Sequence, residues 1–278
     1  MKGLAILLEP RRLLLLGLTT GLCLPAFAAR DLNSMANLHP LDTFTADVLD
    51  KGEWYYGQPP IPAPGYNFVG LSDKLTLQID YTAWLGGLPS LNLRQRLFGQ
   101  RGQGLSAALE GMLLYMRADL DEMDPDNDTL YIRRRGWNGY LRLNTSLRLS
   151  DKARLHTSLG ISYSEYLHIQ NENRPTVIGK EHVELLDPAA MLGLEYRFSP
   201  KLMWITNVSY GETWLLLENR PRKEQLVYGF RWVPMAGQRR GIFSNLAIDL
   251  IALYARFPDA DEENRFPLPI FPVLTWQW

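Results

Sequence analysis

Cysteine is almost absent from this sequence, since Cys23 is the only one in 278 residues. A single cysteine excludes an internal disulfide framework and a thiolate metal site. A basic excess is absent as well, because 29 Lys and Arg face 30 Asp and Glu, and this argues against a nucleic-acid partner. Glycine-rich phosphate loops, His-rich clusters and zinc-ligand spacings are also missing, so we expect neither a metal nor a cofactor.

Long hydrophobic runs are the next absence. Beyond residue 28, no apolar stretch reaches the ~18–20 residues of a membrane-spanning helix. At the start of the chain, three basic residues precede an apolar run at 13–24, and an A-x-A site ends at Ala28. This order predicts a secretory signal peptide over residues 1–28. A lipoprotein would use Cys23, but a bulky residue, Leu22, stands before it.

What the chain does contain is strict alternation of apolar and polar residues. In ARLHTSLGISYSEYL (153–167), apolar residues fall on one face and polar or small residues on the other. The pattern recurs at 74–84, 139–150 and 244–255, and it is typical of strands with one wet and one apolar side. An exported chain of this kind is either a soluble sandwich or a closed barrel in an outer membrane.

The breaks between these strands alternate in length. LSDKL (71–75), LSDKA (149–153) and FSPKL (198–202) are tight polar reversals, whereas longer polar stretches occupy 117–128, 168–181, 217–224 and 258–265. Short turns alternating with long loops are typical of transmembrane barrels. We therefore predict an all-β fold, an antiparallel transmembrane β-barrel of about twelve strands, with ten or fourteen as alternatives. The expected strands are 44–56, 66–71, 74–84, 89–98, 104–116, 129–149, 153–167, 183–198, 201–216, 225–233, 241–257 and 267–278.

The chain ends in FPLPIFPVLTWQW (266–278), in which Trp276 and Trp278 share a parity with apolar residues. A terminal aromatic after alternating apolar residues resembles the C-terminal signal of Gram-negative outer-membrane β-barrel proteins. That resemblance implies an outer-membrane location, lipid and lipopolysaccharide as surroundings, and the barrel assembly machinery as a partner. Three prolines in this stretch predict either a short, irregular closing seam or a strand whose upper part lies above the bilayer. The predicted domains are a signal peptide (1–28), a periplasmic lead-in (29–43) and the barrel (44–278).

Aromatic residues on the apolar parity predict a girdle at the membrane interface, where indole and phenol rings are favoured. The candidates are Tyr115, Trp137, Tyr163, Tyr196, Trp204, Trp232, Tyr254, Trp276 and Trp278. Charged residues on the wet parity are candidates for the pore lining. They are Asp80, Arg94, Arg96, Glu110, Arg142, Arg148, His156, Glu195, Arg197, Arg231 and Asp249.

Such a lining favours a passive channel for small hydrophilic solutes, and anionic ones where arginines cluster. The alternative is a barrel whose paired charges fill the lumen, so that it acts through its structure or its surface. A lipid-active hydrolase is a third hypothesis, because His156 and Ser158 are spaced like the nucleophile and base of outer-membrane phospholipase. Their wet parity and their place near a short turn argue against catalysis, and we expect no enzyme.

Two further stretches suggest sites that the residues do not complete. In DLDEMDPDNDT (119–129), the aspartates follow the first positions of a calcium loop, but Thr129 replaces the required glycine. A solvated loop with weak affinity for divalent ions is the expectation. In IRRRGW (132–137), three arginines stand where a strand would meet lipid phosphates, and a solvated strand end explains them equally well.

Overall fold

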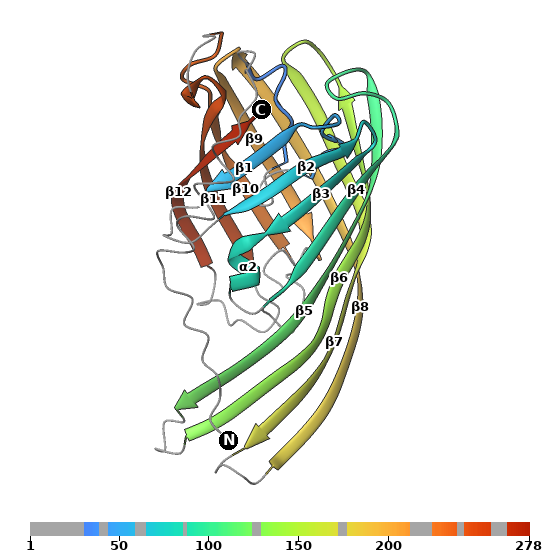
Figure 1. Cartoon of the computed structure of the whole chain (residues 1–278), viewed down its shortest axis with the longest axis vertical. Helices are drawn as coiled ribbons and strands as arrows, with labels where there is room; N and C mark the ends of the chain where they lie inside the picture. The colour runs from blue at the N-terminus through green and yellow to red at the C-terminus, as the bar shows by residue number, and fades with distance from the viewer. Residues whose placement is uncertain are drawn as a thin grey trace.

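The computed structural model describes residues 31–38, 44–58, 65–85, 88–123, 129–171, 177–211, 224–237, 242–256 and 266–278. These residues form a closed antiparallel barrel in which every strand pairs with its neighbours in the sequence and β1 pairs with β12 (Figure 1). The predicted all-β fold and the count of twelve strands are confirmed. The predicted signal peptide lies outside the described residues.

The strands differ greatly in length. They are β1 (Trp54–Gln58), β2 (Tyr66–Ser72), β3 (Leu75–Asp80), β4 (Ser90–Phe98), β5 (Leu105–Met123), β6 (Thr129–Arg148), β7 (Ala153–Asn171), β8 (Val177–Ser199), β9 (Leu202–Tyr210), β10 (Glu224–Trp232), β11 (Leu246–Arg256) and β12 (Phe266–Gln277). A helical turn, α2 (Tyr81–Leu85), follows β3, and a 3-10 turn, η1 (Ile242–Asn245), precedes β11.

The repeated turn motif has one structural explanation. Ser72, Ser150 and Ser199 each accept a hydrogen bond on the side-chain oxygen from the backbone N–H two residues later, at 3.3, 3.2 and 3.2 Å. Ser150 and Ser199 also accept from the N–H three residues later. The serine side chain thereby satisfies donors that the strand ladder leaves free at a tight reversal. We call the end of the barrel that carries these turns the short-turn end, and the opposite one the long-loop end.

The alternation seen in the sequence separates the two faces of the wall. Large apolar side chains are exposed on the outer face of neighbouring strands, as with Leu109, Leu143, Leu159, Leu192 and Phe230. Buried polar side chains occupy the inward positions between them. This is the reverse of a soluble protein, in which the apolar face lies inside. Among the described residues, no helix is long and apolar enough to span a membrane.

Replacing Leu159 by arginine tests this outer face. Leu159 is 64% exposed on β7, midway along the apolar stretch, and an arginine at the bilayer midplane costs about 2–4 kcal/mol. We expect the free energy of unfolding, measured by urea titration in lipid vesicles, to fall by that amount. Arginine in place of the exposed Gln100, in the turn between β4 and β5, is the control and should change it by under about 0.5 kcal/mol. Equal effects at the two positions would contradict a lipid-facing wall.

The four strands β5–β8 are taller than the rest. They contain 19, 20, 19 and 23 residues, whereas about 9–11 residues suffice to cross a bilayer at a tilt. Figure 1 shows them extending together, toward the bottom of the view, far beyond the long-loop end of the other strands. The predicted loops at 117–128 and 168–181 are therefore wrong for much of their length, because the ladder between β5, β6, β7 and β8 continues through them.

The closing seam is short. Among the described residues, four pairs join β1 to β12, from Tyr55↔Gln277 to Gln58↔Leu274, while β12 pairs with β11 along most of its length. The backbones of Trp54 and Trp278 complete the seam with two hydrogen bonds of 2.7 and 2.9 Å. All three prolines of β12 lie beyond the residues that pair with β1, which suits residues that lack a ladder donor. The alternative that we favour, an upper part of the strand above the bilayer, stays a prediction.

Three predicted strands need correction. Residues 44–53 are not a strand, and β1 begins only at Trp54. The strand expected over 74–84 ends at Asp80, whose carboxylate accepts a hydrogen bond from the Ala83 N–H at 3.0 Å and so caps α2. The strand expected from 241 begins at Leu246, after η1. In the first case, inward side chains of the wall supply the partners of Ala46 and Leu49, and in the second the Asp80 carboxylate caps the helical turn.

Candidate functional site: a lumen closed by the N-terminal segment

Residues 31–38 and 44–49, which we call the plug, lie inside the barrel. They were expected as a periplasmic lead-in and the start of a strand, but nearly all are buried and their hydrogen bonds go to inward-facing groups. The backbone N–H groups of Ala46 and Leu49 donate to Ser146 Oγ and Thr76 Oγ1, each at 2.8 Å. The plug contains no strand, so it is an insert in the lumen and not part of the wall.

Apolar contacts hold the plug against two sides of the wall. Leu32 and Met35 pack with Met203, Ile205, Val233 and Ala247 from β9 to β11. Ala36, Leu38 and Leu49 pack with Tyr55, Tyr66 and Phe68 from β1 and β2. Each large apolar side chain buried in this way contributes about 1.5–3 kcal/mol. The plug is therefore packed tightly at the short-turn half of the lumen.

An ionic network joins the plug to β7 and β8. The carboxylate of Asp47 accepts from Arg154, with Nη2 2.6 Å from Oδ1 and Nη1 3.1 Å from Oδ2, and it also accepts from the Asn37 N–H at 3.1 Å. Arg154 and Asn37 both reach Glu195, at 3.3 and 2.8 Å. All four side chains are buried. Removing one partner of a buried pair of this kind strongly destabilises the folded protein.

The ionisation of Asp47 follows from these contacts. Burial by itself raises the pKa of the Asp47 carboxyl, but the guanidinium of Arg154 more than offsets it, and the pKa lies below its ordinary value. Glu195 works against this by raising that pKa. Asp47 is consequently ionised at neutral pH, and the plug depends on that charge.

Arg231 forms a second link between the plug and the wall. Its Nε and Nη2 donate to the two oxygens of Asp249 at 2.7 and 2.8 Å. It also donates to Tyr55 OH at 3.1 Å and to Asn37 Oδ1 at 3.4 Å. At the end of the chain, Gln277 Oε1 accepts from the Ala36 N–H at 2.7 Å. The inward residue of the terminal motif thus binds the plug.

Glu110 organises the wall on the other side of the plug. Its carboxylate accepts from Asn92, Arg94, Tyr140 and Asn144 at 2.6–3.1 Å. Arg94 also donates to the backbone oxygen of Asp47 at 3.1 Å. Next to this cluster, the guanidinium of Arg142 lies between the rings of Phe44 and Tyr140, 3.8 and 3.5 Å from their centroids, which is favourable cation–π geometry.

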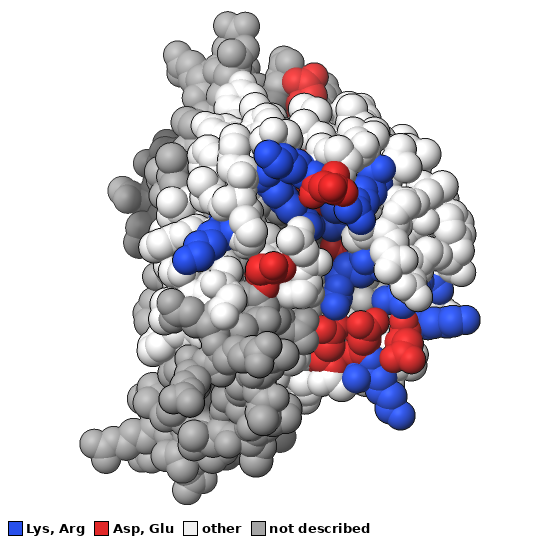
Figure 2. Space-filling model, turned by 90° about the horizontal axis from the view of Figure 1, so that it is seen from above, with Lys and Arg blue, Asp and Glu red and all other residues white. Residues whose placement is uncertain are grey.

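Most of the predicted lining residues lie on the inward face. Arg94, Glu110, Arg142, His156, Glu195, Arg231 and Asp249 are buried there, and Asp80, Arg96 and Arg197 are half-buried. Arg148 is different, because it lies at the rim and donates to Asp151 at 2.5 Å. Figure 2, which looks onto the short-turn end, shows basic and acidic side chains gathered there.

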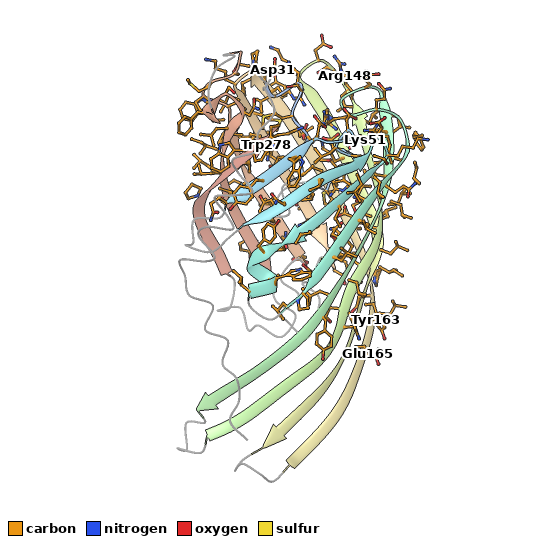
Figure 3. All side chains as sticks on the ribbon, in the orientation of Figure 1. Asp31, Lys51, Arg148, Tyr163, Glu165 and Trp278 are labelled. Carbon is orange, nitrogen blue, oxygen red and sulfur yellow. The ribbon has the colours of Figure 1, made fainter. Side chains whose placement is uncertain are left out.

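The predicted girdle residues all lie outside the buried interior, in two groups. Tyr115, Trp137, Tyr163 and Tyr254 lie toward the long-loop end of their strands, whereas Tyr196, Trp204, Trp232, Trp276 and Trp278 lie toward the short-turn end. Tyr163 donates to Glu165 at 2.6 Å. Figure 3 shows this pair low on the tall wall, far from Asp31 and Arg148 at the other end. Contact of these rings with lipid headgroups stays a prediction.

The two residues considered for catalysis are both buried on the inward face of β7. His156 Nδ1 lies 2.8 Å from Ser146 Oγ, so its partner is a serine of β6 and not Ser158. His156 Nε2 lies 3.5 Å from Glu195 Oε1. Within the described ranges, no three His, Cys, Asp or Glu side chains are grouped to hold a metal. The aspartates at 124, 126 and 128 lie outside those ranges.

Sequence reasoning missed the residues that tie the plug to the wall. Asn144 and Ser146 had the wet parity and could have been found, but neither is charged. Arg154 immediately follows a turn and was not considered. Asp47 and Asn37 had no signal at all, because their importance depends on β7 and β8, more than 100 residues away along the chain.

No family model and no curated protein matches this chain. The similar solved structures are outer-membrane β-barrels. The translocator domain of autotransporter NalP from Neisseria meningitidis has 8% identity and a TM-score of 0.47, with 81% of this chain and 85% of that chain covered. OmpT of Vibrio cholerae has 11% identity and a TM-score of 0.38, with 77% and 64% covered. The CymD monoaromatic hydrocarbon channel has 9% identity and a TM-score of 0.33, with 82% of this chain and 88% of that chain covered.

Proposed function

We propose that this chain is an outer-membrane channel for small hydrophilic solutes and that its own plug closes it from within. The observation that carries the proposal is that the wall closes without the plug: all twelve strands pair around the barrel, and none of these pairs involves residues 31–49. Removing the plug would leave an intact barrel with a polar interior. A polar lumen in an apolar wall is suited to passage of water-soluble molecules.

Placing the short-turn end in the periplasm agrees with the usual arrangement of such barrels, in which turns are short on that side and loops long outside. The plug then closes the periplasmic half of the lumen. The C-terminal segment is proposed as the signal for the assembly machinery, with Trp276 and Trp278 outward and Gln277 inward. A permanently plugged structural barrel is the competing function, and the depth of the apolar contacts favours it.

A reversible lock distinguishes these two functions. Ala46 and Ala108 of β5 belong to one buried apolar cluster, and both side chains are small, so the pair Ala46→Cys and Ala108→Cys is chosen to form a disulfide between plug and wall. The background carries Cys23→Ser. In a planar bilayer we expect a silent barrel when oxidised, and discrete conductance steps under applied voltage after reduction.

Two outcomes would overturn the proposal. Conductance steps of equal frequency in the oxidised and the reduced double-cysteine variant would show that the plug is not the gate. Silence in both states, for a barrel whose folding is verified by heat-modifiable migration in gels, would show that the lumen is permanently closed. The single variant Ala46→Cys cannot form the disulfide and is the matched control. Its conductance should be the same before and after addition of the reductant.

A further inference from the structure

The inward face of β6–β9 carries a patch of polar atoms without hydrogen-bond partners. Asn144 Oδ1, His156 Nε2, Asn207 Nδ2 and Ser209 Oγ make no hydrogen bond, although their residues are 0%, 0%, 2% and 7% exposed. Leaving such atoms buried and unpaired costs free energy, and native proteins keep few of them. Their grouping on one part of the wall therefore calls for a function.

The strand register brings these atoms together. One inward row runs Ser146↔His156↔Gly193↔Asn207, and the next runs Asn144↔Ser158↔Met191↔Ser209. We call these two rows the polar patch. Gly193 leaves the inward face of β8 without a side chain between His156 and Asn207. A glycine inside a strand often marks a place where a ligand or another backbone comes close.

The chemistry of the patch selects an uncharged partner. Asn207 Nδ2 can only donate, Asn144 Oδ1 can only accept, and Ser209 Oγ can do both. The amide and hydroxyl atoms carry no charge, and the neighbouring charges of Glu195 and Arg154 are already paired with each other, so an ionised solute would lose its hydration at these atoms without gaining an ion pair. A molecule with several hydroxyl groups supplies donors and acceptors at once. Across the three strand spacings from β6 to β9 the patch is about 14 Å wide, which is room for one or two sugar rings.

We propose that the polar patch binds neutral, polyhydroxylated solutes of the size of a sugar as they pass through the barrel. This inference rests on the proposed channel function and names its solute class. The plug lies at the edge of the patch, because the Ala46 N–H donates to Ser146 Oγ and Asn37 donates to Glu195, two residues from Gly193. The patch is buried while the plug is in place, so binding of the solute favours the open state.

Three probes of similar size and different charge test the solute class: glucose, gluconate and glucosamine. Their uptake into proteoliposomes is compared for the full chain carrying Asp47→Ala, which weakens the plug, with and without Asn207→Leu plus Ser209→Ala. We expect glucose to enter faster than either charged probe. Loss of the two patch residues should lower glucose uptake roughly tenfold and leave gluconate and glucosamine unchanged.

The controls separate the two proposals. Ser162→Ala removes an inward hydroxyl of β7 that donates to the Asp187 backbone oxygen outside the patch, and glucose uptake should stay as in the Asp47→Ala parent. Entry of all three probes at equal rates, unaffected by the patch substitutions, would overturn the solute class and leave the channel standing. Exclusion of all three probes from a correctly folded barrel would overturn the channel itself.

Discussion

Replacing Asp47 by alanine should open the barrel. The substitution removes both hydrogen bonds from Arg154 and the one from the Asn37 N–H, and it leaves a guanidinium buried with only part of its charge compensated. Breaking a buried pair in this way costs about 3–5 kcal/mol. That shifts the ratio of closed to open states by a factor of roughly a hundred to several thousand. The measurement is open probability in a planar bilayer at low voltage.

The neighbouring Asp50 provides the matched control. Its side chain is 56% exposed and lies 3.3 Å from Arg96, and an exposed pair of this kind contributes about 0–1 kcal/mol. Asp50→Ala should therefore leave the open probability nearly unchanged. If the two alanine variants behave alike, the buried network does not hold the plug.

Acid should reproduce the effect of Asp47→Ala. The pKa of Asp47 is lower in the folded protein than in the unfolded chain. The stabilisation from its charge is therefore complete above the unfolded value of about 3.9, and it is lost as the pH falls through the lowered folded value. We expect wild-type open probability to rise only in strong acid, whereas Asp47→Ala should lack that rise.

Replacing Glu110 by alanine should strongly destabilise the wall. Four side chains from β4 and β6 donate to this carboxylate; without it Arg94 stays buried with no carboxylate partner, and Tyr140 and Asn144 lose the acceptor of their hydrogen bonds. A loss of about 3–5 kcal/mol is expected. With a urea dependence of about 1–3 kcal/mol/M, the unfolding midpoint should fall by at least about 1 M.

Glu110→Gln separates charge from shape at this position. Glutamine keeps one acceptor oxygen, so the amide and hydroxyl donors retain part of their bonding while Arg94 loses its ion pair. Its midpoint should lie between those of the wild type and Glu110→Ala. A Glu110→Ala midpoint within error of the wild type would mean that lumen water replaces the carboxylate and that the cluster is not structural.

Much of the wall could be predicted because each strand carries its own evidence. In β7, alternation from Leu155 to Tyr163 separates a lipid-facing side from an inward one, and no other part of the chain is needed to see it. The turn at Ser150 and its near-copies are equally local. The tall ends of β5, β7 and β8 were missed because their alternation weakens beyond the apolar stretch, although the ladder continues; the strand predicted over 129–149 already covered the whole of β6.

The plug could not be predicted for a physical reason. A segment inside a lumen is surrounded on all sides, so it needs neither the period of a strand nor that of a helix. Its polar residues are placed by distant partners, as Asn37 is by Glu195. In sequence, residues 31–49 look like a lead-in and an irregular strand.

The sequence by itself determined the barrel: its twelve strands, its two faces and its tight turns follow from period-2 alternation and serine-containing reversals, which are local properties of the chain. Only the tertiary structure decided that the lumen is closed, that Asp47, Arg154 and Glu195 meet, and that unpaired polar atoms gather around Gly193. These features arise from strand register and from a segment folded into the barrel, and both bring together residues that no local pattern connects.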